Sequence, residues 1–289
     1  MSEFTIQALL ETATVSVRDI YCRGSCRAAT PEESTQGSHF VFPYRGVFVR
    51  HVGCTAAVAE ANQVLLFSPD EGYRVSHPVT GGDASLSLSV DDDQLRELAP
   101  RSLLGPGPAL AFARQRLHID PRTQALVASI RHRLRSRLAE PLEAESLTLS
   151  LVQRALGPRP SPAIGAMGTT RAISGRERLV DRAKLVLTAD LSRRWTLADV
   201  AREVGASPVY LTQVFQQVEG VPLYRYQLRL RLARSLDLLE RFHDLSALAL
   251  ELGFSSHSHF SAAFQQTYGR SPSAFRRSVL RPRGARPRR

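Results

Sequence analysis

The C-terminal part of the chain repeats itself, and this repeat constrains the fold more than any other feature of the sequence. Residues 197–205 recur 48 positions later as residues 245–253, and residues 211–220 recur 49 positions later as residues 260–269. Each copy has apolar residues at helical spacing, then a glycine, then a second apolar run at the same spacing. This order predicts two helix-turn-helix units.

Local signals agree with helices at these positions. Thr196 and Asp199 have the spacing of a capping box. Ser207 stands before a proline, which suits the start of a second helix. Gly205 and Gly253 can adopt the positive φ that ends a helix. We therefore expect the first helix of each unit to end at these glycines.

The second helix of each unit is predicted to bury one stripe and expose the other. Leu211 and Phe215, with their counterparts Phe260 and Phe264, form the expected buried stripe. The opposite face is polar or small. Its members are Val209, Thr212, Gln213 and Gln216 in the first unit, and His257, Ser258, Ser261 and Ala262 in the second. Residues 222–242 have the spacing of one long helix that would hold the two units at a fixed distance.

Residues 176–277 closely resemble the DNA-binding domain of the AraC/XylS family of bacterial transcription regulators, through residues 253–264 followed by 269–276. The resemblance implies that the second helix of each unit enters a major groove and contacts bases with its exposed face. Family members often carry arginine where this chain has Gln213 and Ala262, which argues against guanine recognition there. Gln213 suits adenine and Val209 suits a thymine methyl group. The second unit offers fewer base contacts, so DNA shape and the backbone are its expected targets.

Contacts to DNA phosphates are expected beside these faces. Arg225 and Arg229 lie one helical turn apart on the connecting helix, although such arginines also serve solubility alone. Phosphate contacts position a protein on DNA without specifying sequence. The candidate set is Thr196, Ser207, Arg225, Arg229 and Ser256.

The positive charge of the chain is concentrated in the same region. The net charge is +11, and residues 174–289 contain 20 basic and 10 acidic residues, against 18 and 17 in residues 1–173. Only one of the 38 basic residues, Lys184, is a lysine. Arginine forks suit phosphate groups and guanine edges. The distribution therefore favours a polyanionic partner, and together with the repeat it indicates double-stranded DNA.

The first hundred residues have the pattern of strands. Residues 40–52 are predicted to form a strand pair around a turn, and shorter strands are expected at 64–67, 73–77 and 86–90. Strands at this spacing predict a compact antiparallel barrel or sandwich. Residues 43–47 and 62–74 resemble a cupin-like barrel of the kind found in AraC-type sensors. The predicted fold is therefore a multidomain α+β protein, with a β-barrel and a helical pair before an all-α domain.

Two amphipathic helices are expected after the strands. Leu126, Ile130, Leu134 and Leu138 recur every four residues, and a second helix is predicted to begin at residues 140–141. The pair could pack on the barrel, form a dimer interface, or do both.

Composition suggests five segments. The barrel is expected over residues 1–100 and the helical pair over residues 101–157. Residues 158–175 are rich in proline, glycine and serine and have the composition of a linker. The DNA-binding domain is expected over residues 176–280, followed by a basic, disordered tail at residues 281–289.

The barrel interior is a candidate site for a small organic effector. The candidate residues are Arg45, Arg50, His51, Arg74 and His77, for each of which an ordinary surface or core role is the favoured alternative. No cofactor is expected. A cupin metal site is not expected either, because the usual His-x-His is absent, His39 stands alone, and Tyr73 occupies the place of a later histidine ligand.

The three cysteines leave two interpretations. Cys22, Cys26 and Cys54 are expected to be reduced thiols. Their spacing also resembles part of the zinc-thiolate site of Ada-type methyl-acceptor proteins. That site requires a fourth thiolate, and the fourth position here is Ala57.

The sequence as a whole predicts a bacterial transcription regulator that is not an enzyme, with activation favoured by the resemblance. No apolar stretch is long enough to span a membrane and no signal peptide is apparent, so a cytoplasmic protein is expected. Expected partners are double-stranded DNA, a second copy of the chain, RNA polymerase by family resemblance, and an unknown effector. The alternative is a nonspecific architectural DNA binder.

Overall fold

The computed structural model describes the chain except for residues 1–3, 25, 106–109, 158–169 and 281–289. The arginine-rich tail therefore lies outside the described residues, as does most of the expected linker. The last positions of that linker, from Thr170 on, already belong to a helix. We use "N-terminal unit" for the described residues up to 157 and "C-terminal unit" for residues 170–280.

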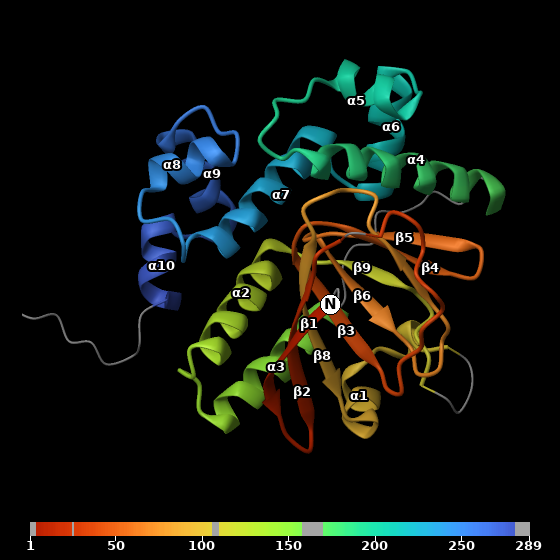
Figure 1. Ribbon diagram of the computed structural model, residues 1–289, viewed down its shortest axis with the longest axis vertical. Coiled ribbons are helices and arrows are strands. Elements are labelled where there is room, and N and C mark those ends of the chain that lie inside the picture. Colours follow the sequence, from red (N-terminus) through yellow and green to blue (C-terminus); the bar gives the residue numbers. More distant parts are fainter. Residues whose placement is uncertain (1–3, 25, 106–109, 158–169, 281–289) are drawn as a thin grey trace, which may run out of the picture.

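Two antiparallel sheets form the core of the N-terminal unit (Figure 1). The six-stranded sheet has the order β1 (Phe4–Glu11), β2 (Val15–Cys22), β8 (Asp83–Val90), β3 (His39–Arg45), β6 (Gln63–Phe67) and β9 (Arg116–His118). The three-stranded sheet has the order β5 (Thr55–Ala59), β4 (Phe48–Val52) and β7 (Arg74–Ser76). The antiparallel prediction is confirmed. The closed barrel is wrong, because within the described residues no hydrogen-bonded ladder joins the two sheets.

The predicted strand pair over residues 40–52 is also wrong. The strands exist, but β3 pairs with β8 and β6, whereas β4 pairs with β5 and β7 in the other sheet. The chain crosses between sheets at Gly46, which has a φ of 70°. A Cβ atom there would lie 2.1 Å from the carbonyl oxygen of Gly82, so only glycine fits this crossing.

Helices cover one face of the larger sheet. A short helix α1 (Asp92–Leu98) and a 3₁₀ turn at Arg101–Leu103 lead towards α2 (Pro121–Arg135) and α3 (Pro141–Leu156). Residues of α2 and α3 share one buried core with residues of β2, β3, β6 and β8. The two helices therefore pack on the sheet. Their role in a dimer stays a prediction.

The C-terminal unit is entirely helical, as predicted. Its helices are α4 (Thr170–Ala189), α5 (Leu197–Val204), α6 (Pro208–Glu219), α7 (Leu223–Leu238), α8 (Leu245–Glu251), α9 (His257–Tyr268) and α10 (Pro272–Leu280). Figure 1 shows the two helix-turn-helix units at opposite ends of α7. Each has its own apolar core, and α7 contributes Tyr226 and Leu230 to the first core and Leu232 and Leu236 to the second.

The predicted helix signals are confirmed. Thr196 and Asp199 form a reciprocal capping box at the start of α5. The Ser207 side chain accepts a hydrogen bond from the backbone N–H group of Tyr210. Gly205 and Gly253 have φ angles of 65° and 75°. These local interactions explain why the repeat could be recognised from sequence.

Candidate nucleic-acid interface

We call the second helix of each helix-turn-helix unit its reading helix. The first reading helix, α6, has one buried and one exposed face. Leu211, Val214 and Phe215 are buried in the core of the first unit. The predicted base-facing side chains Val209, Thr212, Gln213 and Gln216 are all exposed. Val209 is 68% exposed, which is unusual for a valine and leaves its methyl groups open to a partner. The hydroxyl group of Thr212 donates to the carbonyl oxygen of Pro208 at 3.0 Å.

The second reading helix, α9, has the same arrangement with smaller side chains. Phe260, Ala263 and Phe264 are buried in the second core. His257, Ser258 and Ala262 are exposed, and Ser261 is partly exposed. The hydroxyl group of Ser261 lies 3.2 Å from Nε2 of His257. This face therefore offers hydroxyl and imidazole groups but no guanidinium group.

Three of the candidate phosphate-binding residues occupy helix N-termini. The N-caps of α5, α6 and α9 are Thr196, Ser207 and Ser256. Each hydroxyl oxygen accepts a hydrogen bond from the backbone N–H group three residues later, at 3.1–3.2 Å. Helix N-termini attract anions because their first N–H groups point outward. Arg225 is exposed and Arg229 partly exposed on α7, and neither forms an ion pair within the described residues.

Arg231 connects the two helix-turn-helix units, and sequence reasoning missed it. Its Nε donates to the carbonyl oxygen of Leu191 at 2.6 Å, before the first unit, and its Nη1 donates to that of Gly253 at 3.2 Å, in the turn of the second. A Cβ atom on Gly253 would lie 2.1 Å from the carbonyl oxygen of Ser192. The backbone of the loop that leads into the first unit thus meets the turn of the second unit directly. Nothing in the sequence distinguishes this arginine from its neighbours on α7.

A buried cluster of charged groups joins the first unit to the N-terminal sheets. Nζ of Lys184 on α4 lies 2.6 Å from Oε1 of Glu219 on α6. Nε2 of His118 on β9 lies 2.8 Å from the other carboxylate oxygen of Glu219. Burial alone would raise the pKa of Glu219, but the charge of Lys184 and the contact with His118 lower that pKa to about 2. Glu219 is therefore a carboxylate at neutral pH.

A second carboxyl group faces the same cluster from the N-terminal unit. The hydroxyl group of Tyr226 on α7 donates to Oε1 of Glu60 at 2.5 Å, and the backbone N–H of Asn62 donates to Oε2 at 2.7 Å. Burial raises the pKa of the Glu60 carboxyl group. Nearby, Arg116 on β9 donates to Asp181 on α4 at 2.8 Å. Every group of this cluster thus has a partner in the other unit or beside it.

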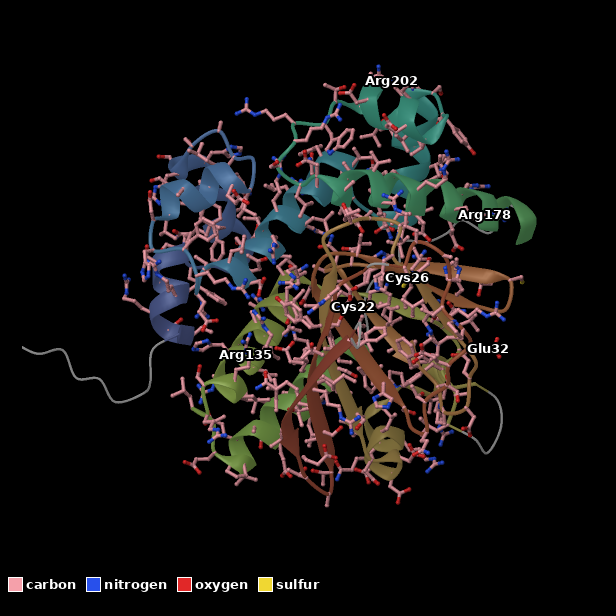
Figure 2. The ribbon with its side chains drawn as sticks, in the orientation of Figure 1. Cys22, Cys26, Glu32, Arg135, Arg178 and Arg202 are labelled. Carbon is pink, nitrogen blue, oxygen red and sulfur yellow. The ribbon has the colours of Figure 1, made fainter. Side chains whose placement is uncertain are left out.

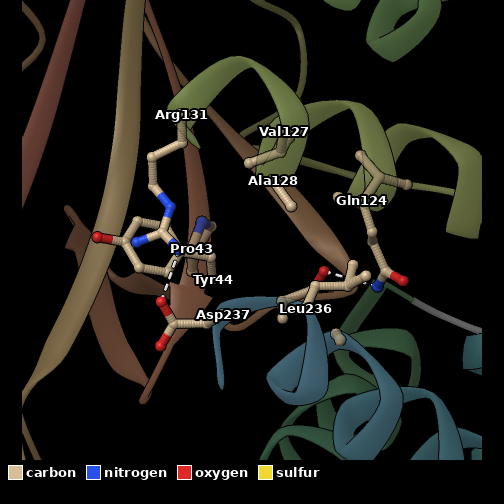
Figure 3. Close-up of a pocket in the computed structure, with 11 residues that line it drawn as sticks. Pro43, Tyr44, Gln124, Val127, Ala128, Arg131, Leu236 and Asp237 are labelled. Atoms are coloured by element: carbon tan, nitrogen blue, oxygen red, sulfur yellow. Dashed lines mark hydrogen bonds and ion pairs between the residues drawn. The ribbon is translucent and has the colours of Figure 1, made fainter. Parts of the chain in front are cut away.

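A separate ion pair joins α2 to the middle of the C-terminal unit (Figure 3). Nη2 of Arg131 donates to Oδ1 of Asp237 on α7 at 2.6 Å, and both side chains are buried. The Arg131 guanidinium lies 3.9 Å from the ring centre of Tyr44, whose hydroxyl group donates to Asp19 at 2.6 Å. These groups border a pocket between the units. It is lined by Pro43, Tyr44, Ala61, Ile119, Gln124, Val127, Ala128, Arg131, Ala233, Leu236 and Asp237.

The five candidate effector residues do not line this pocket, and three of them lie in separate surroundings. Arg50 is buried, donates to the carbonyl oxygen of Leu66 at 2.7 Å and to Glu71 at 2.6 Å, and its guanidinium lies over the Phe67 ring. Arg45 lies over the ring of Tyr21. Arg74 is exposed beside Glu32.

The other two candidates are histidines. His51 lies 2.8 Å from the hydroxyl group of Ser76. His77 is buried, and its Nε2 lies 2.8 Å from Oδ1 of Asp83. All five side chains therefore have partners within the N-terminal unit.

The cysteines are divided between two places. Cys54 is exposed in the turn between β4 and β5, whereas Cys22 is buried and Cys26 partly buried. Within the described residues, no group of three or more metal-ligating side chains includes Cys54. The spacing that resembled an Ada-type site thus does not bring the three thiols together. In the part of the chain that the structure describes, no helix is long and apolar enough to cross a membrane.

Known proteins resemble this chain over different shares of its length. Residues 200–278 match the family model of a helix-turn-helix domain. The regulatory protein PocR of Salmonella typhimurium is 31% identical over 112 residues, which are 38% of this chain and 37% of PocR. LumQ of Photobacterium leiognathi is 24% identical over 260 residues, 87% of this chain and 96% of LumQ. A transcriptional regulator from Chromobacterium violaceum, described as AraC-type, has 28% identity, with 37% of this chain and 97% of that chain covered, at a TM-score of 0.35.

Two helix-turn-helix units on one helical scaffold, each with an exposed second helix, define a paired DNA-binding domain. The match to the helix-turn-helix family model covers residues 200–278 of this domain. The match to PocR covers little more than a third of that protein's length.

Proposed function

We propose that the protein is a sequence-specific, DNA-binding transcription regulator and acts as an activator. One observation carries the proposal. Both reading helices bury one face in a core of their own unit and leave the other face open. An unpaired polar face on the second helix of such a unit is the surface that enters a major groove.

The two reading helices have different tasks in this proposal. On α6, Gln213 pairs with adenine and Val209 meets a thymine methyl group, while Thr212 and Gln216 complete the face. On α9, the side chains of His257, Ser258, Ser261 and Ala262 are short, so this unit follows DNA shape and backbone more than base edges. Arg225, Arg229 and the three capping hydroxyl groups position the domain on phosphates.

The N-terminal unit regulates the reading domain in this proposal. Buried ion pairs such as Arg131–Asp237 and Lys184–Glu219 span or border the contact between the units. Buried ion pairs add little net stability over apolar packing but are destroyed by small displacements, because an unpaired buried charge is costly. A ligand that shifts the sheets against α4 or α7 therefore disturbs these ion pairs and, through them, the DNA-binding domain.

The remaining parts of the proposal follow the family. The protein acts in the cytoplasm as a homodimer through the N-terminal unit, contacts RNA polymerase, and responds to a small molecule. The segments at 1–157 and 176–280 correspond to the regulatory and the reading parts.

Selection of genomic fragments by the purified full-length chain, followed by footprinting of the best fragment, tests the proposal. We expect protection of two neighbouring major grooves and an affinity at least about 10³ times that for random DNA at the same salt concentration. The variant Gln213→Ala tests the part of α6 in base recognition. Its matched control is Gln153→Ala, at an exposed glutamine on α3. Equal affinity for random DNA would contradict the proposal and favour a nonspecific architectural binder.

A further inference from the structure

Three metal-ligating side chains meet inside the N-terminal unit, at a place that the proposed function does not use. Cys22 and Asp83 are directly opposite each other in the antiparallel pair β2–β8. His77 follows β7 and approaches the same point from the other sheet. One ligand atom of each residue lies within 4.8 Å of the other two, and all three residues are buried.

The imidazole ring of His77 is held from both sides. Its Nε2 lies 2.8 Å from Oδ1 of Asp83, and its Nδ1 lies 3.1 Å from Sγ of Cys26. The backbone N–H of His77 also donates to the carbonyl oxygen of Cys26 at 2.8 Å. A histidine that ligates a metal through one nitrogen is commonly oriented through the other. Cys26 provides that orientation.

Glycines allow the backbone to close around the cluster. Gly24 and Gly82 have φ angles of 64° and 69°. A Cβ atom on Gly82 would lie 2.4 Å from the carbonyl oxygen of Cys22, and a Cβ atom on Gly24 would lie 2.9 Å from Cα of Gly82. The segments that carry Cys22 and Asp83 are therefore fixed at a separation that no other residue type permits at these positions.

The contact between Asp83 and His77 is close but is not aligned as a hydrogen bond. Oδ1 of Asp83 is buried, and although it lies 2.8 Å from Nε2 of His77, it accepts no aligned hydrogen bond. A misaligned contact gives a buried carboxylate oxygen less stabilisation than a well-aligned hydrogen bond. A bound cation at this point would satisfy it.

We propose that Cys22, His77 and Asp83 bind one zinc ion. Thiolate, imidazole and carboxylate are the three ligand types that zinc takes in proteins. Bonds of about 2.0–2.3 Å at tetrahedral angles place ligand atoms roughly 3.3–3.6 Å apart. Small side-chain rotations give the three ligand atoms this separation, with the 2.8 Å contact between His77 and Asp83 opening slightly. The Cys22 thiol loses its proton to solvent when the metal–sulfur bond forms. The fourth position is left for water or an effector atom.

The site is connected to the reading domain through the loop between His77 and Asp83. Val79 in this loop and Leu185 on α4 pack against the same buried cluster of Val47, Val49 and Val58. Figure 2 shows Cys22 and Cys26 inside the N-terminal unit, with Cys26 nearer to the C-terminal helices. Metal binding that orders the loop therefore acts on the first helix of the C-terminal unit. This last step rests on the proposed function, whereas metal binding itself does not.

Titration of the metal-stripped, reduced full-length chain with Co²⁺ tests the site directly. We expect one equivalent to bind with a thiolate-to-cobalt charge-transfer band and the intense visible bands of tetrahedral cobalt, and Zn²⁺ to displace it. Cys22→Ser, His77→Gln and Asp83→Asn should each weaken binding about tenfold or more, with loss of the charge-transfer band in Cys22→Ser. Cys54→Ser, an exposed cysteine outside the cluster, should bind like the parent protein.

Absorption spectroscopy at the zinc edge of the loaded parent protein gives a result that does not depend on the folding of any variant. One sulfur ligand with nitrogen and oxygen neighbours is expected. No bound equivalent, a shell without sulfur, or equal loss in Cys54→Ser and Cys22→Ser would overturn the proposal. Both measurements omit DNA, so their failure is distinguishable from failure of the proposed regulator function.

Discussion

Lys184 and Glu219 form an ion pair, with 2.6 Å between Nζ and Oε1, from which solvent is almost completely excluded. Lys184 is the sole lysine of the chain. In the sequence it belonged to the basic surplus that indicated DNA, but in the structure it is fully buried and pairs with Glu219, the last residue of α6. With His118 on the other carboxylate oxygen, the pair joins α4 and α6 to the N-terminal sheet.

Replacement of Lys184 by methionine should destabilise the protein strongly. Glu219 would remain buried without its cation, and breaking such a pair from one side typically costs about 3–5 kcal/mol. Urea unfolding of Lys184→Met measures the loss. The double variant Lys184→Met/Glu219→Leu should recover most of it, because no buried charge remains. Equal losses in the single and double variants would show that the pair is not the cause.

Acid should lower the free energy of unfolding of the protein through protonation of Glu219. Its pKa falls from the ordinary 4.5 to about 2 on folding, so the unfolded chain takes up this proton first. The stabilisation is complete above pH 4.5 and is lost as the pH falls towards 2. Urea unfolding across this range should show a smaller slope of the free energy of unfolding against pH for Glu219→Gln than for the parent protein. The comparison isolates Glu219 from other carboxyl groups with lowered pKa values, such as Asp120 and Asp199. Identical slopes would contradict the assignment.

Gln213→Ala and Arg229→Ala should weaken DNA binding in different ways. Loss of the Gln213 amide should remove about 1–3 kcal/mol of discrimination at one base pair, so the sequence preference changes. Loss of Arg229 should weaken binding to all DNA sequences alike. It should also reduce the salt dependence of the affinity by about the amount due to one phosphate contact. Binding of a panel of single-base operator variants separates the two patterns. A uniform loss for Gln213→Ala would refute its part in base recognition.

Gly253→Ala and Gly205→Ala form a matched pair. Both glycines have positive φ, which an alanine tolerates at about 1–2 kcal/mol. At Gly205 the new Cβ meets nothing within 4 Å, whereas at Gly253 it would lie 2.1 Å from the carbonyl oxygen of Ser192. Thermal unfolding should therefore show the larger loss for Gly253→Ala, and DNA binding should fall because the two units move apart. Equal losses would mean that the contact between the units yields easily.

The reading domain was predictable because its signals are local. A capping box, an N-cap serine and a C-terminal glycine each lie within a few residues of the helix end that they define, and the repeat presents them twice. The exposed faces of α6 and α9 followed from helical spacing alone. Arg231 did not, since its role depends on carbonyl groups 40 and 22 residues away.

The N-terminal unit was less predictable because its contacts are long-range. The strand pattern indicated antiparallel sheets, but β3 and β4 separate into different sheets at Gly46, and no local signal marks that crossing. Tyr226 and Glu60 are 166 residues apart in the sequence. Cys22 and Asp83 become neighbours only through the register of β2 with β8, and β2 was not among the predicted strands.

The position of Arg231 has a consequence for the DNA that such a protein selects. One guanidinium holds carbonyl groups from the loop that leads into the first helix-turn-helix unit and from the turn of the second, and Gly253 lies against Ser192 without room for a methyl group. In the proposed role the two reading helices are therefore held at a fixed separation. A single inserted base pair between the two half-sites turns one of them by roughly a tenth of a helical turn. Operators should therefore tolerate changed bases far better than changed spacing.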